Sequence, residues 1–282
     1  MEKLQKALKK ARQERQGHDV ADTGAASRPA PKAGTRAKPV EDATVDQTWG
    51  ALKSFEPDPE FLVRNRILTY SAQSRSTLFD ILRTKIFLMM RQNGWTRLAI
   101  TSPEKGCGKT TIACNLALGF SRQHEVRSML FDLDLRLPGI ARTLGLSPPH
   151  GIRSLLAGEV PPEEQLLRVR NNLAISAANQ AVDDPTQILL SDQTAHAFDL
   201  LQAQFKPDIM IFDLSPMLVT DDARAVLKNV DCALIVARAE QTRMSQLDTC
   251  EREVAEYTNV LGVTLNDCRH VEKGDDYHDD YT

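Results

Sequence analysis

Continuous apolar runs alternate with amphipathic stretches along most of the chain, from about residue 55 onward. The apolar runs consist of Val, Ile, Leu and similar residues without alternating polar positions, which is typical of strands buried on both faces of a sheet. Repeated strand–helix units of this length predict an α/β fold with a doubly wound, mostly parallel sheet. The predicted strands are 96–101, 126–132, 172–176, 208–214, 231–237 and 259–265, and the predicted helices are 73–93, 109–122, 138–144, 151–157, 186–204, 218–228 and 243–257.

The N-terminal part of the chain has a different pattern. Leu4 and Leu8 recur at helical spacing among lysines and arginines, which predicts a basic amphipathic helix over 1–17. Its thin apolar stripe leaves two interpretations open. The helix can dock onto a partner or an anionic membrane surface, or it can be a solvated, marginal helix. Residues 18–54 are rich in Ala, Pro, Gly, Thr and charged residues, so we expect a disordered linker there.

Composition narrows the class of protein further. The 282 residues carry a net charge of −3, which argues against nucleic acid as the main partner. No apolar run approaches the length of about 18 residues that spans a membrane. The five cysteines show no C-x-x-C spacing, so we expect reduced thiols in a cytosolic protein. The remaining sequence predicts one large domain over 55–270 and an acidic tail with two tyrosines over 271–282.

The segment 102–111 reads Ser-Pro-Glu-Lys-Gly-Cys-Gly-Lys-Thr-Thr and lies between a predicted strand and a predicted helix. Such a turn presents backbone N–H groups to an anion, and the helix N-terminus behind it carries partial positive charge. Lys109 would reach the β- and γ-phosphates of a nucleotide, and the Thr110 hydroxyl would ligate Mg²⁺. Pro103 replaces the first glycine of the G-x-x-x-x-G-K-[ST] pattern. The segment therefore predicts a P-loop nucleotide site.

Two further predicted strands end in aspartate. One leads through an apolar run into Asp132, followed by Asp134, and the other ends at Asp213. Ligands of open α/β sheets bind at the carboxyl ends of the strands, where phosphoryl transfer needs a metal and a carboxylate. An aspartate at a strand end can also be a helix cap or a turn residue. Combined with Lys109 and Thr110, these carboxylates favour a phosphoryl-transfer site.

These segments together resemble the Walker A, Walker A′ and Walker B motifs of bacterial tyrosine kinases, the capsule and exopolysaccharide regulators of the polysaccharide co-polymerase system. The resemblance covers about residues 62–270, and its most diagnostic part is the D-x-D-x-R pattern at 132–136. It implies a P-loop NTPase fold that binds ATP and Mg²⁺, and a cytoplasmic tyrosine autokinase at the inner face of the membrane. It also implies activation by a membrane-embedded polysaccharide chain-length regulator.

The resemblance assigns roles to individual residues. Asp132 would position or deprotonate the acceptor tyrosine hydroxyl, and Asp134 and Asp213 would hold Mg²⁺ with Thr110. Arg136 would face the phosphates, while Asn266 would contact the base. The catalytic set would be Lys109, Asp132, Asp134 and Arg136, the nucleotide-binding set Gly106, Cys107, Gly108, Lys109, Thr110, Thr111 and Asn266, and the phosphoacceptors Tyr277 and Tyr281 of the chain's own tail.

Two features depart from the family pattern. The ring-forming helix of the family carries Glu-x-x-Arg-x-x-Arg, whereas the matching positions here are Thr77, Asp80 and Arg83. The sequence therefore leaves open whether the chain forms a homo-oligomer. The tail is also sparse, because Tyr277 and Tyr281 are its only tyrosines and can be incidental residues of a solvated segment.

Two rival functions remain open from the sequence. Partitioning ATPases of the same fold use a signature lysine five positions before the P-loop lysine, where this chain has Glu104. A carboxylate there would repel the phosphates of a partner's nucleotide. A non-catalytic ATP-binding regulator of polysaccharide assembly is the second rival, and the altered helix 77–83 and the sparse tail favour it.

Overall fold

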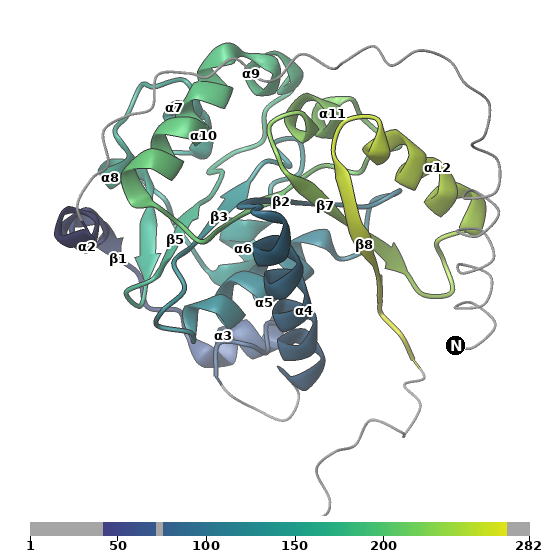
Figure 1. The fold of residues 1–282 in the computed structure, drawn as a ribbon, viewed down its shortest axis with the longest axis horizontal. Helices are drawn as coiled ribbons and strands as arrows, with labels where there is room; N and C mark the ends of the chain where they lie inside the picture. The colour runs from purple at the N-terminus through teal and green to yellow at the C-terminus, as the bar shows by residue number, and fades with distance from the viewer. Residues whose placement is uncertain (1–41, 72–75, 270–282) are drawn as a thin grey trace, which may run out of the picture. The chain divides into compact units, whose positions relative to one another are not determined.

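The computed structural model describes residues 42–71 and 76–269, which form an eight-stranded sheet with helices on both faces (Figure 1). The strand order is β1-β4-β5-β3-β6-β2-β7-β8, and the pairs are parallel except β4 with β5. The strands are β1 (Lys53–Ser54), β2 (Arg97–Thr101), β3 (Ser128–Asp132), β4 (Leu167–Val169), β5 (Leu173–Ser176), β6 (Ile209–Asp213), β7 (Cys232–Arg238) and β8 (Asn259–Asn266).

The helices follow the strands in the alternation that the sequence predicts. The doubly wound, mostly parallel sheet is confirmed, and each predicted strand is present within two residues of its expected ends. The helices are α2 (Asp42–Ala51), α3 (Pro59–Arg64), α4 (Thr77–Asn93), α5 (Lys109–Ser121), α6 (Ile140–Leu144), α7 (Ile152–Leu156), α8 (Pro162–Gln165), α9 (Thr186–Leu190), α10 (Asp192–Phe205), α11 (Asp222–Leu227) and α12 (Met244–Ala255).

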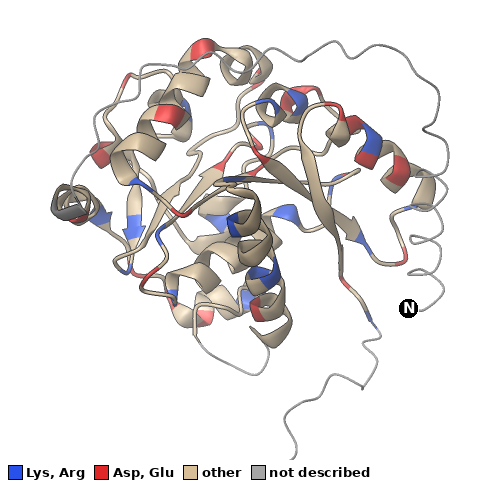
Figure 2. Cartoon of the chain, viewed as in Figure 1, with Lys and Arg blue, Asp and Glu red and all other residues tan. Residues whose placement is uncertain are grey.

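Two apolar cores lie against the sheet, one on each face. Helices α2, α7, α10, α11 and α12 contribute to one core, in which the rings of Phe131 and Phe212 stack at 5.1 Å and both lie against Phe198. Helices α3, α4, α5 and α6 contribute to the other. The middle strands are drawn largely in tan in Figure 2, because their side chains are apolar on both faces.

The structure corrects the expected linker over 18–54 in its last part. Residues 42–51 form α2, in which Val45 and Trp49 are buried, and the indole Nε1 of Trp49 donates a 2.8 Å hydrogen bond to the Phe205 carbonyl. Strand β1 pairs with β4. Isolated apolar residues in a polar segment give little periodicity, and their burial depends on α10, which is distant in sequence. The helix expected over 1–17 and the tail over 271–282 lie outside the described residues.

The helix expected over 186–204 is divided in two. Ser191 has extended backbone angles between α9 and α10, and its hydroxyl accepts a 3.2 Å hydrogen bond from the Thr194 N–H. This is the geometry of a helix N-cap, which begins a new helix at Asp192. Among the described residues, no helix has the length and apolar character needed to cross a bilayer.

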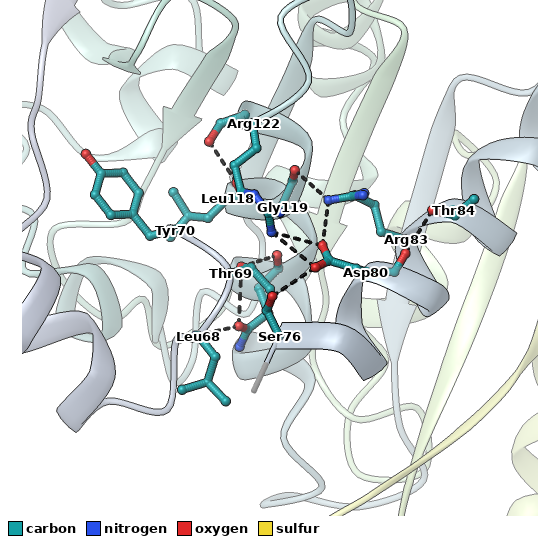
Figure 3. Close-up of polar contacts among 12 residues, drawn as sticks. Leu68, Thr69, Tyr70, Ser76, Asp80, Arg83, Thr84, Leu118, Gly119 and Arg122 are labelled. Carbon is teal, nitrogen blue, oxygen red and sulfur yellow. Dashed lines mark hydrogen bonds and ion pairs between the residues drawn. The ribbon is translucent and has the colours of Figure 1, made fainter. Parts of the chain in front are cut away.

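Polar contacts tie α4 to α5, the helix that follows the P-loop (Figure 3). The Asp80 carboxylate accepts hydrogen bonds from Arg83 at 2.7 Å, Arg122 at 3.0 Å and Ser76 at 2.8 Å. The Arg83 guanidinium, which is largely buried, also donates to the Gly119 carbonyl at 3.0 Å. Asp80 and Arg83, which match positions of the family's ring motif, therefore make contacts within this chain.

Candidate active site

The P-loop joins β2 to α5 near the middle of the sheet. Two glycines give it a left-handed backbone, with φ of 78° at Gly106 and 95° at Gly108, and Gly108 is the N-cap of α5. A Cβ on Gly108 would lie 2.0 Å from the Asn266 Nδ2 atom. That amide donates a 2.9 Å hydrogen bond to the Cys107 carbonyl. The loop can therefore approach the end of β8 this closely because it carries glycine at this position.

Lys109 and Asp134 face one another across the loop. The Lys109 Nζ atom lies 3.7 Å from Asp134 Oδ2, and both side chains are more than 90% buried. Burial raises the pKa of the Asp134 carboxyl, while the nearby Lys109 ammonium lowers it. The backbone N–H of Leu137 donates to the other carboxylate oxygen at 3.3 Å. The Lys109 charge is therefore directed toward Asp134 rather than toward solvent.

Asp213 and Asp132 end neighbouring strands and are both fully buried. The Thr110 hydroxyl donates a 2.6 Å hydrogen bond to Asp213 Oδ2, and the Ile140 N–H donates to Asp132 Oδ2 at 3.0 Å. Burial raises the pKa of Asp213 to about 7, against the opposing effects of Lys109 and Thr110. Burial, and then the charge of Asp213, raise the pKa of Asp132 well above its usual range.

One carboxylate oxygen of each buried aspartate has no hydrogen-bond partner among the described residues: Oδ1 of Asp132 and Oδ1 of Asp213. A buried carboxylate oxygen without a donor is costly unless a ligand or ion satisfies it. The described residues contain no group of three His, Cys, Asp or Glu arranged for a metal ion. Mg²⁺ in nucleotide sites needs fewer protein ligands, because phosphates and water complete its octahedron. Thr110, Asp134 and Asp213 fit that requirement.

The structure places Arg136 differently from the expectation that it faces the phosphates. Its Nε and Nη2 atoms contact the two Asp222 oxygens at 2.5 and 3.2 Å, and Nη1 donates to the Asp183 carbonyl at 2.7 Å. Asp222 is buried and also accepts from the Thr186 hydroxyl at 2.6 Å. These hydrogen bonds help to lower the pKa of Asp222, against the effect of its burial. Arg136 therefore connects the segment after β3 to α9 and α11.

A cavity of about 760 Å³ opens over the P-loop. It brings together Gly106, Gly108, Lys109, Thr110 and Thr111 of the loop with Asp134 and Asn266, while the predicted residues Cys107, Asp132, Asp213 and Arg136 do not line it. Sequence reasoning missed three basic lining residues that lie outside the P-loop segment: Arg66, Arg142 and Arg238. The lining residues are Val63, Arg66, Leu68, Phe79, Lys105, Gly106, Gly108, Lys109, Thr110, Thr111, Asp134, Leu137, Arg142, Arg238, Asn266 and Asp267.

Comparisons with known proteins agree with this geometry. No family model matches the chain. It is 26% identical over 187 residues to the putative tyrosine-protein kinase EpsB of Ralstonia nicotianae, covering 66% of this chain and 24% of EpsB. It is 26% identical over 203 residues to the tyrosine-protein kinase YwqD of Bacillus subtilis, covering 71% of this chain and 84% of YwqD.

The fold leads to the same group of proteins. The kinase domain of VpsO superposes with a TM-score of 0.60 at 25% identity, covering 69% of this chain and 98% of that domain. The chain is a homologue of bacterial tyrosine kinases. It is also 29% identical over 174 residues to the succinoglycan biosynthesis transport protein ExoP of Rhizobium meliloti, covering 60% of this chain and 22% of ExoP.

The extent of these matches differs between the relatives. The chain spans about a quarter of the length of EpsB and about a fifth of ExoP, but most of YwqD. The matched part of this tyrosine-kinase homologue corresponds to a kinase domain, because nearly the whole VpsO kinase domain is covered.

Proposed function

We propose that the chain is an ATP-dependent protein-tyrosine kinase that phosphorylates Tyr277 and Tyr281 of its own C-terminal segment. The observation that carries this proposal is the grouping of Lys109, Asp134 and Thr110 at one cavity beside the P-loop. A phosphate cradle, a metal site and a carboxylate are the parts that in-line phosphoryl transfer requires. The kinase homologues support the choice of tyrosine as the acceptor.

The residues of this chain would divide the work of the reaction. The P-loop amides and Lys109 would hold the β- and γ-phosphates, and the lysine charge would oppose the charge that develops on the transferred group. Thr110, Asp134 and Asp213 would hold Mg²⁺, which neutralises phosphate charge when bound. Asp132 would accept the tyrosine proton as the new O–P bond forms and the bond to the bridging oxygen of ADP breaks. Its Oδ1 atom, which has no hydrogen-bond partner among the described residues, would be the atom that receives this proton.

The biological setting is the assembly or export of a polysaccharide at the inner face of the membrane. The resemblance to capsule and exopolysaccharide kinases and the similarity to ExoP support this part of the proposal. A membrane-embedded chain-length regulator would be the activator.

A second candidate is a nucleotide-binding regulator without turnover. The contacts of Asp80 and Arg83 within the chain favour it, because these side chains are then not offered to a neighbouring subunit. The partitioning-ATPase alternative has less support. Glu104, at its signature position, is hydrogen-bonded to Gln246 of α12.

The test is a phosphotyrosine assay on the purified full chain with Mg²⁺-ATP. The variants are Lys109→Met and the double substitution Tyr277→Phe/Tyr281→Phe. Signal in the wild type that disappears in both variants supports the autokinase. Retained ATP binding without any signal, also in the presence of a membrane activator, supports the regulator. ADP-dependent dissociation of a dimer without phosphotyrosine supports the partitioning-type ATPase.

A further inference from the structure

Two arginines line the cavity without a charge partner. Arg66 lies just after α3 and Arg142 lies on α6, and both are exposed. Neither side chain forms an ion pair within 42–71 or 76–269. By contrast, Lys109 and Arg238 are paired with carboxylates, Asp134 for the lysine and Asp267 for the arginine. Lys105 of the P-loop also lines the cavity without an ion pair among the described residues, so Arg66 and Arg142 are the unpaired charges that lie outside the P-loop.

The backbone at Arg66 is held by partly buried hydrogen bonds. The Asn115 side chain on α5 donates to the Arg66 carbonyl at 3.0 Å and accepts from the Leu68 N–H at 2.8 Å. Arg66 has a left-handed backbone with φ of 62°, a conformation that is unfavourable for residues other than glycine. Asn115 itself is fully buried. This segment is therefore held against α5 rather than left as a loose surface loop.

Both arginines lie on the side of the P-loop away from Asn266. In the sheet, β8 lies beyond β7 on one side of β2, and β3 lies beyond β6 on the other. Helix α6 follows β3, and Gly139 before it lies so close to the P-loop that a Cβ there would be 3.0 Å from Thr110. Helix α3 packs against α6. In Figure 1, α3 lies to the lower left of α5 and β8 lies to its right.

This arrangement separates the two ends of an in-line reaction. If Asn266 contacts the base, the leaving ADP extends from the P-loop toward β8. The nucleophile must approach the γ-phosphate from the opposite direction. That direction is the side of Arg66 and Arg142, where two exposed apolar residues, Val63 and Leu137, also line the cavity.

We propose that Arg66 and Arg142 bind acidic side chains next to the acceptor tyrosine, so that the enzyme selects tyrosines flanked by Asp or Glu. Val63 and Leu137 supply apolar surface for the tyrosine ring. The C-terminal sequence Gly-Asp-Asp-Tyr-His-Asp-Asp-Tyr-Thr over 274–282 has this chemistry, with four aspartates and no Lys or Arg. The inference rests on the proposed kinase function.

The experiment uses the full chain with Tyr277→Phe/Tyr281→Phe as the enzyme, which removes its own acceptors. Two synthetic peptides are offered in trans: the 274–282 sequence, and the same sequence with each Asp replaced by Asn. We expect Arg66→Ala and Arg142→Ala each to raise the KM for the Asp peptide about tenfold, as for the loss of one charge-assisted hydrogen bond. The KM for ATP and for the Asn peptide should stay unchanged. The matched control is Arg153→Ala, which removes an exposed arginine on α7 away from this cavity.

The charge-reversed variant Arg66→Glu/Arg142→Glu should prefer a peptide in which Lys replaces each Asp. Equal increases in the KM for both original peptides would show that the arginines do not select acidic side chains. An increase in the KM for ATP would assign the arginines to the nucleotide. Either result would overturn the inference. Unchanged selectivity for the Asp peptide would overturn it as well. If the unsubstituted chain phosphorylates neither its own tail nor a peptide, the kinase function itself fails, and the inference fails with it.

Discussion

The contact between the P-loop and β8 leads to a quantitative prediction for Gly108→Ala. At a φ of 95° the backbone alone disfavours alanine by about 1–2 kcal/mol. The new Cβ would lie 2.0 Å from Asn266 Nδ2, so the amide must turn away. It then loses its 2.9 Å hydrogen bond to the Cys107 carbonyl, which costs about 1 kcal/mol more. We expect the free energy of unfolding to fall by about 2–3 kcal/mol.

Gly94 provides a matched control for the backbone part of this cost. It has a φ of 67° at the end of α4, and no atom lies within 4 Å of a Cβ built there. Gly94→Ala should therefore cost about 1–2 kcal/mol, and the excess cost of Gly108→Ala isolates the contact with Asn266. Asn266→Ala removes the same hydrogen bond, so the double substitution Gly108→Ala/Asn266→Ala should be about as unstable as Gly108→Ala alone.

Urea unfolding followed by circular dichroism measures these differences. Two results would refute the reasoning: a Gly108→Ala variant no less stable than Gly94→Ala, or fully additive costs in the double variant. Nucleotide binding provides a second readout. Because Gly108 and Asn266 both line the cavity, Gly108→Ala should weaken ATP binding whereas Gly94→Ala should not.

Three further predictions concern other parts of the molecule. The pKa of Asp213 is about 7 in the folded state, above its unfolded value. In EDTA, which removes Mg²⁺, the contribution of this carboxyl to stability is therefore present below about pH 4 and is lost as the pH rises through 7. Asp213→Asn should remove that part of the pH dependence of the urea midpoint. Trp49→Ala should lower stability by about 3–5 kcal/mol, and an unchanged melting temperature would show that α2 does not belong to the folded body. Arg136→Met and Asp222→Asn should lower kcat by similar factors, and their effects should not add in the double variant, because each breaks the same ion pair. A rise in the KM for ATP in Arg136→Met alone would instead place this arginine at the phosphates.

Much of the fold was predictable from local sequence patterns. The P-loop turn, the aspartates at the ends of β3 and β6, and the parallel sheet are encoded by apolar runs and by residue types that favour one local conformation. The pairing of Lys109 with Asp134 and of Thr110 with Asp213 follows from the rule that strand ends meet at one edge of the sheet.

Other features depend on contacts between residues that are far apart in the chain. Trp49 is buried because α10 lies beside α2, and Arg136 binds Asp222 because α11 lies beside the segment after β3.

The amino-acid sequence by itself determined which segments form strands and helices and where the phosphate loop lies, because these properties depend on neighbouring residues. The tertiary structure alone decided which charges are neutralised. Arg66 and Arg142 belong to no motif, yet they line the cavity unpaired, whereas Arg136 belongs to a motif and is held by Asp222. The physical reason is that the partner of a side chain is set by strand order and helix packing, which local residue spacing does not specify.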